Sequence, residues 1–262
     1  MKMKKIFTGA LLMAMAVSSW AQTPEEKGLE IAVEGDKRSE GYGDSKVKLK
    51  MVLIDKKGRE SSRDMRVKGL EGKEGAGDKS LMIFDTPKDQ KGVAMLTFTH
   101  KVKSDDQWLF LPALKRVKKI SSRNKSGPFV GSEFAFEDIS SQEVEKYTYK
   151  YLRDETLNGM DCFVVENTPT DKYSGYTKQI VWIDKAEYRA VKIEYYDRKK
   201  SLLKTLQSKD YKQYLGKFWR PSLMEMTNHQ TGKSTRLVYE NYNFNIGLKE
   251  KEFTKNSLKR AR

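Results

Sequence analysis

The residue types that most often carry catalysis are sparse in this chain and poorly spaced for it. It contains 1 Cys and 2 His in 262 residues, and His100 and His229 stand in no metal-ligand spacing and beside no Ser or Cys nucleophile motif. Cys162 lies in the strand-like run DCFVVE, which favours a buried structural thiol without an internal disulfide partner. The glycine-rich residues 72–77 lack the Gly-Lys-Ser/Thr ending of a phosphate-binding loop. We therefore expect no enzyme, no metal site and no cofactor; an enzyme acting on a lipid or a glycan would have only scattered acids to rely on.

Large apolar side chains gather instead between residues 105 and 139, in DDQWLFLPALKRVKKISSRNKSGPFVGSEFAFEDI. Apolar surface close to the point where a loop leaves a sheet suits the binding of an apolar ligand. The candidate ligand-binding residues are Trp108, Phe110, Leu111, Phe129, Phe134 and Phe136. The first three are typical of strand core or cavity wall. The last three flank Gly127, Pro128 and Gly131, a pattern that favours a mobile loop able to plug a pocket, although a static loop contact fits it as well.

A basic ribbon separates the two apolar groups. It consists of Lys115, Arg116, Lys118, Lys119, Arg123 and Lys125, in a chain with 51 Lys and Arg against 36 Asp and Glu and a formal net charge of +15. The ribbon suits docking of an anionic head group, a membrane surface or an acidic protein, or it is simply the solvated face of a strand. Nucleic acid is an unexpected partner, because the chain begins with an export signal.

That signal occupies residues 1–21. Three lysines precede an apolar run at residues 6–17 that is too short to span a bilayer, and Ser19 and Ala21 form a small-x-small cleavage site. We expect cleavage after Ala21 to leave one soluble domain, residues 22–262, in the periplasm. No Cys stands directly after the apolar run, so no lipoprotein acylation site is predicted.

The elements that position these residues are mostly strands. Thr23 as N-cap, Pro24 and Glu26 predict one helix that ends before Gly35. Alternating and β-branched runs separated by short turns then predict about eleven antiparallel strands. So many long strands cannot stay flat, so the sheet must curl. We predict a mainly β protein: one strongly curved antiparallel sheet forming an open half-barrel, with a few α-helices covering its concave side.

The order of these parts resembles the LolA-like outer-membrane lipoprotein-sorting proteins. The resemblance rests on FDTPKD at residues 84–89, DQWLFLPALKRV at 106–117, FVGSEF at 129–134 and EDI at 137–139, with later echoes in WID at 182–184 and YYD at 195–197. It covers essentially the whole chain after the export signal.

The resemblance implies an unclosed barrel with helices across its concave side and an apolar cavity between them. It also implies a periplasmic carrier or chaperone that binds lipoprotein acyl chains or other lipid for transfer towards the outer membrane. The alternative is a non-enzymatic accessory subunit that docks on an inner-membrane exporter of the resistance-nodulation-division type.

Overall fold

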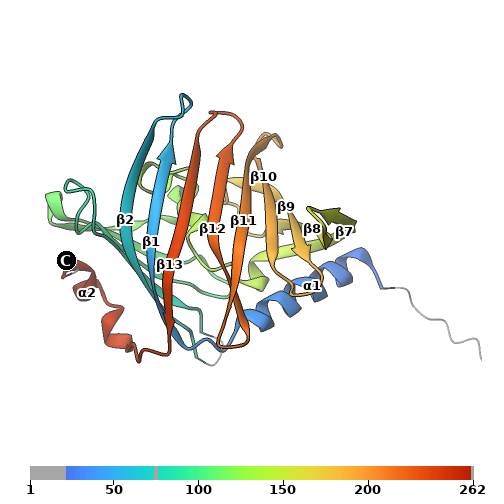
Figure 1. Ribbon diagram of the computed structural model, residues 1–262, viewed down its shortest axis with the longest axis horizontal. Helices are drawn as coiled ribbons and strands as arrows, with labels where there is room; N and C mark the ends of the chain where they lie inside the picture. Colours follow the sequence, from blue (N-terminus) through green and yellow to red (C-terminus); the bar gives the residue numbers. More distant parts are fainter. Residues whose placement is uncertain (1–21, 74–75, 261–262) are drawn as a thin grey trace, which may run out of the picture.

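The computed structural model describes residues 22–73 and 76–260, so the predicted export signal and its cleavage site lie outside the described residues. Within these ranges one antiparallel sheet of thirteen strands dominates the molecule (Figure 1). Its strands are β1 Asp44–Ile54, β2 Glu60–Leu70, β3 Lys79–Phe84, β4 Ala94–Phe98, β5 Asp106–Leu111, β6 Arg116–Ile120, β7 Tyr147–Leu157, β8 Met160–Pro169, β9 Tyr176–Asp184, β10 Ala190–Asp197, β11 Leu202–Tyr214, β12 Phe218–Asn228 and β13 Ser234–Phe244.

The strand order runs β6-β5-β4-β3-β2-β1-β13-β12-β11-β10-β9-β8-β7, so the sheet is open between β6 and β7. This confirms the predicted open, curved sheet. The expected count of about eleven strands is too low, and the basic ribbon supplies one strand of the difference. Its residues 116–120 form the edge strand β6, because they pair with Gln107–Leu111 of β5.

Helix α1, Pro24–Ser39, begins at the predicted capping box. The Thr23 Oγ1 atom accepts a hydrogen bond from the Glu26 backbone N–H at 3.2 Å, and the Glu26 carboxylate accepts one from the Thr23 backbone N–H at 2.8 Å. The helix continues through Gly35, where the sequence predicts its end, and places its last turn over the concave face of the sheet. Among the described residues, no helix has the length and apolar character needed to cross a membrane.

Residues 121–146, here called the plug loop, connect β6 to β7 across the open side of the sheet through short 3₁₀ turns. Phe129 and Phe134 of this loop are each 1% exposed and belong to the main hydrophobic core. That core also contains Met51 and Phe84 from one half of the sheet and Tyr195 from the other. The plug loop therefore fills part of the concave side and packs against both halves.

The short helix α2, Lys255–Lys259, covers the opposite face. In β3, Met82 and Phe84 belong to the main core, whereas Leu81 packs in a second cluster with Leu258 of α2. Successive side chains of a strand point to opposite faces, so α2 lies on the convex side. We predict a few α-helices on the concave side, but of the two α-helices in the described chain only α1 lies there; Figure 1 shows α1 and α2 at opposite sides of the lower end of the sheet.

Candidate functional site

A large pocket opens on the concave face, with a cavity volume of about 1370 Å³. It lies between the last turns of α1, strands β1 and β2, the chain around residues 71–78, the end of the plug loop, and strands from β7 to β13. Its floor is apolar and is formed by alternate residues of neighbouring strands: Val47, Val67, Val165, Val181, Ile183 and Tyr239. The pocket thus combines a largely apolar floor with a polar rim.

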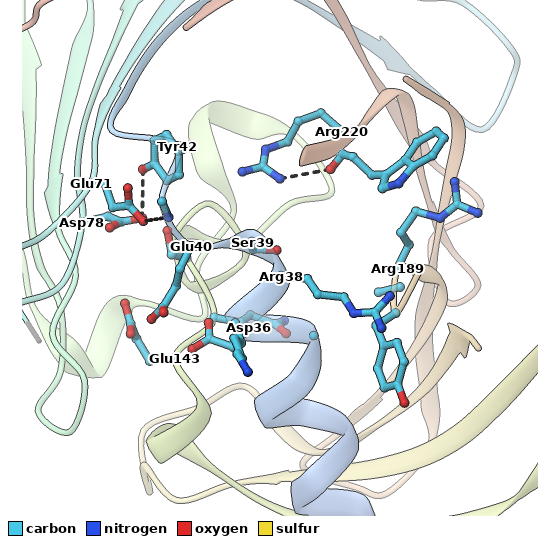
Figure 2. Close-up of a pocket in the computed structure, with 18 of the residues that line it drawn as sticks. Asp36, Arg38, Ser39, Glu40, Tyr42, Glu71, Asp78, Glu143, Arg189 and Arg220 are labelled. Carbon is cyan, nitrogen blue, oxygen red and sulfur yellow. Dashed lines mark hydrogen bonds between the residues drawn. The ribbon is translucent and has the colours of Figure 1, made fainter. Parts of the chain in front are cut away.

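Five carboxylates form one side of this rim, here called the acidic wall. They are Asp36, Glu40, Glu71, Asp78 and Glu143. Figure 2 shows that α1, the chain that follows it, the β2–β3 connection and the plug loop bring them to the same side of the pocket. Asp78 accepts hydrogen bonds from the Tyr42 hydroxyl at 3.0 Å and the Gly72 N–H at 2.9 Å.

The acidic wall is partly removed from water. Burial is the main cause that raises the pKa of Asp36, Asp78 and Glu143 above the usual carboxyl values, and the nearby carboxylates raise it further. Within residues 22–73 and 76–260, none of the five carboxylates forms an ion pair. Hydrogen bonds and nearby cations offset part of this negative charge instead. Glu71 accepts the Gly41 and Gly43 N–H groups at 2.5 and 2.7 Å, Lys101 lowers the pKa of Asp36 and Glu143, and Arg220 lowers the pKa of Asp78.

The described pocket lining also contains six cations, Lys37, Arg38, Lys101, Arg189, Lys217 and Arg220, and two of the arginines form short ion pairs. Arg38 pairs with Glu34 at 2.7 Å, and Arg189 pairs with Asp184 at 2.5 Å. Arg220 donates to the Trp219 carbonyl at 3.0 Å, and Lys217 donates to the Glu40 carbonyl at 2.6 Å. Neither of these two forms an ion pair with a carboxylate of the described residues. The Arg220 guanidinium points toward Tyr42 (Figure 2) and lies 5.6 Å from the centre of its ring, close enough to lower the pKa of Asp78.

The described residues that line the pocket include neither His nor Cys, and no group of three or more His, Cys, Asp and Glu in the described part of the chain is placed to hold a metal ion. The single thiol, Cys162, is buried elsewhere, and burial raises its pKa. A deep apolar floor below charged groups is an arrangement that suits an amphiphile.

None of the six predicted ligand-binding residues lines this pocket. Trp108 and Phe110 pack in the cluster under α2, on the convex face. Leu111 and Phe136 pack against the main core, and Phe129 and Phe134 lie inside it. The structure thus brings four of the six together on the concave side, and their contact with a ligand stays a prediction.

The four residues predicted for docking, Lys115, Arg116, Lys118 and Lys119, are exposed at and just before the edge strand β6. Lys119 pairs with Asp106 at 2.6 Å. They lie away from the pocket, so any partner at this edge would be bound separately from a pocket ligand.

Sequence reasoning missed the acidic wall. Its members come from residues 36–40, 71–78 and 143, and no local spacing connects these segments. Asp36 is the member of the acidic wall that local sequence comes closest to placing, because it directly follows Gly35, where the predicted helix ends. Only the strand order that brings the β2–β3 connection next to the end of α1 could have revealed the rest.

Comparisons with known proteins agree with this architecture. A family model described as an uncharacterized protein matches residues 76–260, and no curated protein matches the chain. An outer membrane lipoprotein-sorting protein domain from Vibrio parahaemolyticus is 60% identical, with 90% of this chain and 100% of that chain covered and a TM-score of 0.88. A DUF1329 family protein from Desulfovibrio piger is 28% identical, with 90% and 99% covered and a TM-score of 0.86.

A LolA superfamily protein from Nitrosomonas europaea shares the fold at 23% identity and a TM-score of 0.70, with 88% of this chain and 98% of that chain covered. The open sheet, the helix across its concave face and these matches lead to one conclusion: the chain belongs to the LolA-like outer-membrane lipoprotein-sorting family.

Proposed function

We propose that this protein is a periplasmic carrier that holds the acyl chain of a lipoprotein or another lipid in the concave-face pocket, for transfer towards the outer membrane. The observation that carries the proposal is the pocket of about 1370 Å³ with its apolar floor, in an open sheet of this family. The name of the Vibrio parahaemolyticus relative supports the same reading.

The energetics of such binding need no catalytic group. Each methylene moved from water into an apolar site contributes about 0.8 kcal/mol, so ten buried methylenes contribute about 8 kcal/mol before the costs of association. Val67, Val165 and Val181 provide the apolar surface for this burial. Contact of cargo with Phe129, Phe134 and Phe136 of the plug loop stays a prediction.

A pocket-filling substitution tests the proposal. Val67 lies on β2 in the pocket floor, so Val67→Trp should fill the acyl site and weaken uptake of a fluorescent fatty acid by about tenfold or more. The control is Val33→Trp, at a side chain that is 48% exposed and outside the pocket lining. Wild-type protein that takes up no fatty acid, and carries no lipid detectable by mass spectrometry after mild purification, would refute the carrier function.

The basic ribbon supports docking less strongly than the pocket supports binding. Lys115, Arg116, Lys118 and Lys119 are exposed in the way that a solvated edge strand requires, since charged residues protect an edge from unwanted pairing. Their contact with a membrane surface or an inner-membrane exporter stays a prediction.

A further inference from the structure

The turn between β5 and β6 presents an exposed apolar side chain among cations. Leu114 is 61% exposed, and the next residue, Lys115, turns the chain in the left-handed conformation at φ 49°. Lys115, Arg116 and Lys118 are exposed, and none of the three has an ion pair within residues 22–73 and 76–260. Protection of the edge strand from unwanted pairing explains a lysine on β6, but it gives no reason for a leucine at the tip of the turn.

The short helix α2 brings further cations to the same edge from the far end of the chain. It packs against β4 and β5. The Lys255 Nζ atom of α2 lies 4.8 Å from the centre of the Trp108 ring, and the Lys119 Nζ atom of β6 lies 5.7 Å from it. Lys119 is paired with Asp106, whereas Lys255 and the exposed Lys259 have no ion pair in the part of the chain that the structure describes. Two segments far apart in sequence therefore form one basic surface.

The turn between β3 and β4 extends this surface. Strand β4 pairs antiparallel with β3 on one side and with β5 on the other, so the β3–β4 turn and the β5–β6 turn leave the sheet at the same end. The β3–β4 turn carries the exposed Lys88 and Lys91, which have no ion pair among the described residues, against one exposed acid, Asp89. The excess of cations thus continues along this end of the sheet.

Cations around an exposed apolar side chain match the surface of an anionic bilayer. The phosphates of the head groups attract cations that lie within a Debye length, about 8 Å at physiological salt. The region just beneath the phosphates accepts an apolar side chain. An acidic protein surface would attract the same cations, but it offers no general place for Leu114. Neither Leu114 nor the cations around it line the concave-face pocket, so the two binding regions are separate.

We propose that the β5–β6 turn, strand β6 and helix α2 form a docking surface for an anionic lipid bilayer. Leu114 enters the head-group region, and Lys115, Arg116, Lys118 and Lys255 bind the phosphates around it. This docking is a property separate from the carriage of lipid in the pocket, and either one can fail without the other.

Sedimentation with lipid vesicles tests the docking surface. The wild type should partition onto phosphatidylcholine vesicles that contain about 30% phosphatidylglycerol about tenfold more strongly than onto phosphatidylcholine alone, and about 0.5 M NaCl should abolish the difference. Lys115→Gln, Arg116→Gln and Lys118→Gln combined should weaken this partition by at least about tenfold, and Leu114→Ser alone by about threefold.

The matched control combines Lys46→Gln, Lys48→Gln and Lys50→Gln. It removes three exposed lysines of β1 that also have no ion pair in the described chain. The change in net charge is therefore the same, but no exposed apolar turn adjoins these lysines, so partition should change by less than about twofold.

The outcomes locate the surface and identify its partner. A wild type that binds anionic and neutral vesicles equally, or a β1 control that loses as much as the β6 variant, would overturn the docking surface. A Leu114→Ser variant that partitions like the wild type would overturn the insertion of the turn. A wild type that ignores vesicles but binds an acidic polypeptide would assign the surface to a protein partner instead. Each variant should keep its circular dichroism spectrum and its uptake of a fluorescent fatty acid, because the substituted residues lie outside the pocket lining.

Discussion

Asp36 illustrates at the scale of one residue what the acidic wall costs the fold. It lies in the last turn of α1, where the negative end of the helix dipole disfavours another negative charge. Burial is the largest cause that raises its pKa above 3.8; Glu40, Glu145 and Asp78 also raise it, and Lys101 lowers it. The protonated carboxyl is thus favoured by the fold.

Asp36 is only half-buried, so solvent screening reduces the electrostatic gain, and we expect Asp36→Asn to stabilise the protein at pH 7 by about 0.5 kcal/mol. Because the folded-state pKa is raised, the stability associated with the protonated form is present below pH 3.8 and is lost as the pH rises through the folded-state pKa. The Asp36→Asn variant has no carboxyl group to ionise at this position, so it keeps this stability at every pH. The free energies of unfolding of the two proteins should therefore differ at pH 7 and converge below pH 3.8. Urea denaturation at both pH values measures this, and an equal gain at both would contradict the electrostatic cause.

At the scale of elements, the contact between α1 and β7 depends on one glycine. A Cβ atom at Gly28 would lie 2.8 Å from the Tyr151 backbone N and 2.9 Å from the Lys150 backbone N, closer than side chains tolerate. Gly28→Ala should therefore push the helix away from β7 and lower stability by about 1–3 kcal/mol, although alanine alone favours a helix by about 1 kcal/mol.

Gly35→Ala is the matched control in the same helix. Its Cβ would meet Tyr188 O at 3.4 Å, an ordinary contact, so this substitution should be neutral or stabilising by up to about 1 kcal/mol. Thermal unfolding of the two variants distinguishes close packing from helix propensity; equal effects would argue against the packing explanation.

The start of α1 and most strands were predictable because their signals are local. The capping box needs only residues 23–26, and strands alternate along their own length. Gly28 was not recognisable as a packing residue, since the close contact that requires a glycine there is with the backbone of β7. The convex position of Trp108 was not recognisable either. Which face of a strand is convex depends on the segments that cover its two faces, and α2, which covers Trp108, comes from the far end of the chain.

At the scale of the whole molecule, the plug loop joins the two halves of a sheet that never closes. Lys204 of β11 and Asp138 of the plug loop form an ion pair at 2.6 Å, and each side chain is only 4% exposed. Lys204 also donates to the Glu133 carbonyl at 2.9 Å, while Tyr176 of β9 donates to Asp138 at 2.8 Å. On the other half, Arg63 of β2 donates to the Val130 carbonyl. These contacts fix the plug loop beside the pocket rim that Glu143 completes.

Lys204→Met should expose how far the fold depends on this anchoring. The substitution leaves the Asp138 charge buried without its cation, which costs about 3–5 kcal/mol. Lys209→Met is the control on the same strand: its pair with Glu225 is 2.5 Å long but 44% and 30% exposed, so its loss should cost less than about 1 kcal/mol. Denaturant unfolding followed by tryptophan fluorescence and circular dichroism should give one coincident, weakened transition for Lys204→Met, because the plug loop shares its core with both halves of the sheet. Two separate transitions would show instead that the plug loop unfolds alone, and a loss no larger than that of Lys209→Met would show that the buried pair does not anchor it.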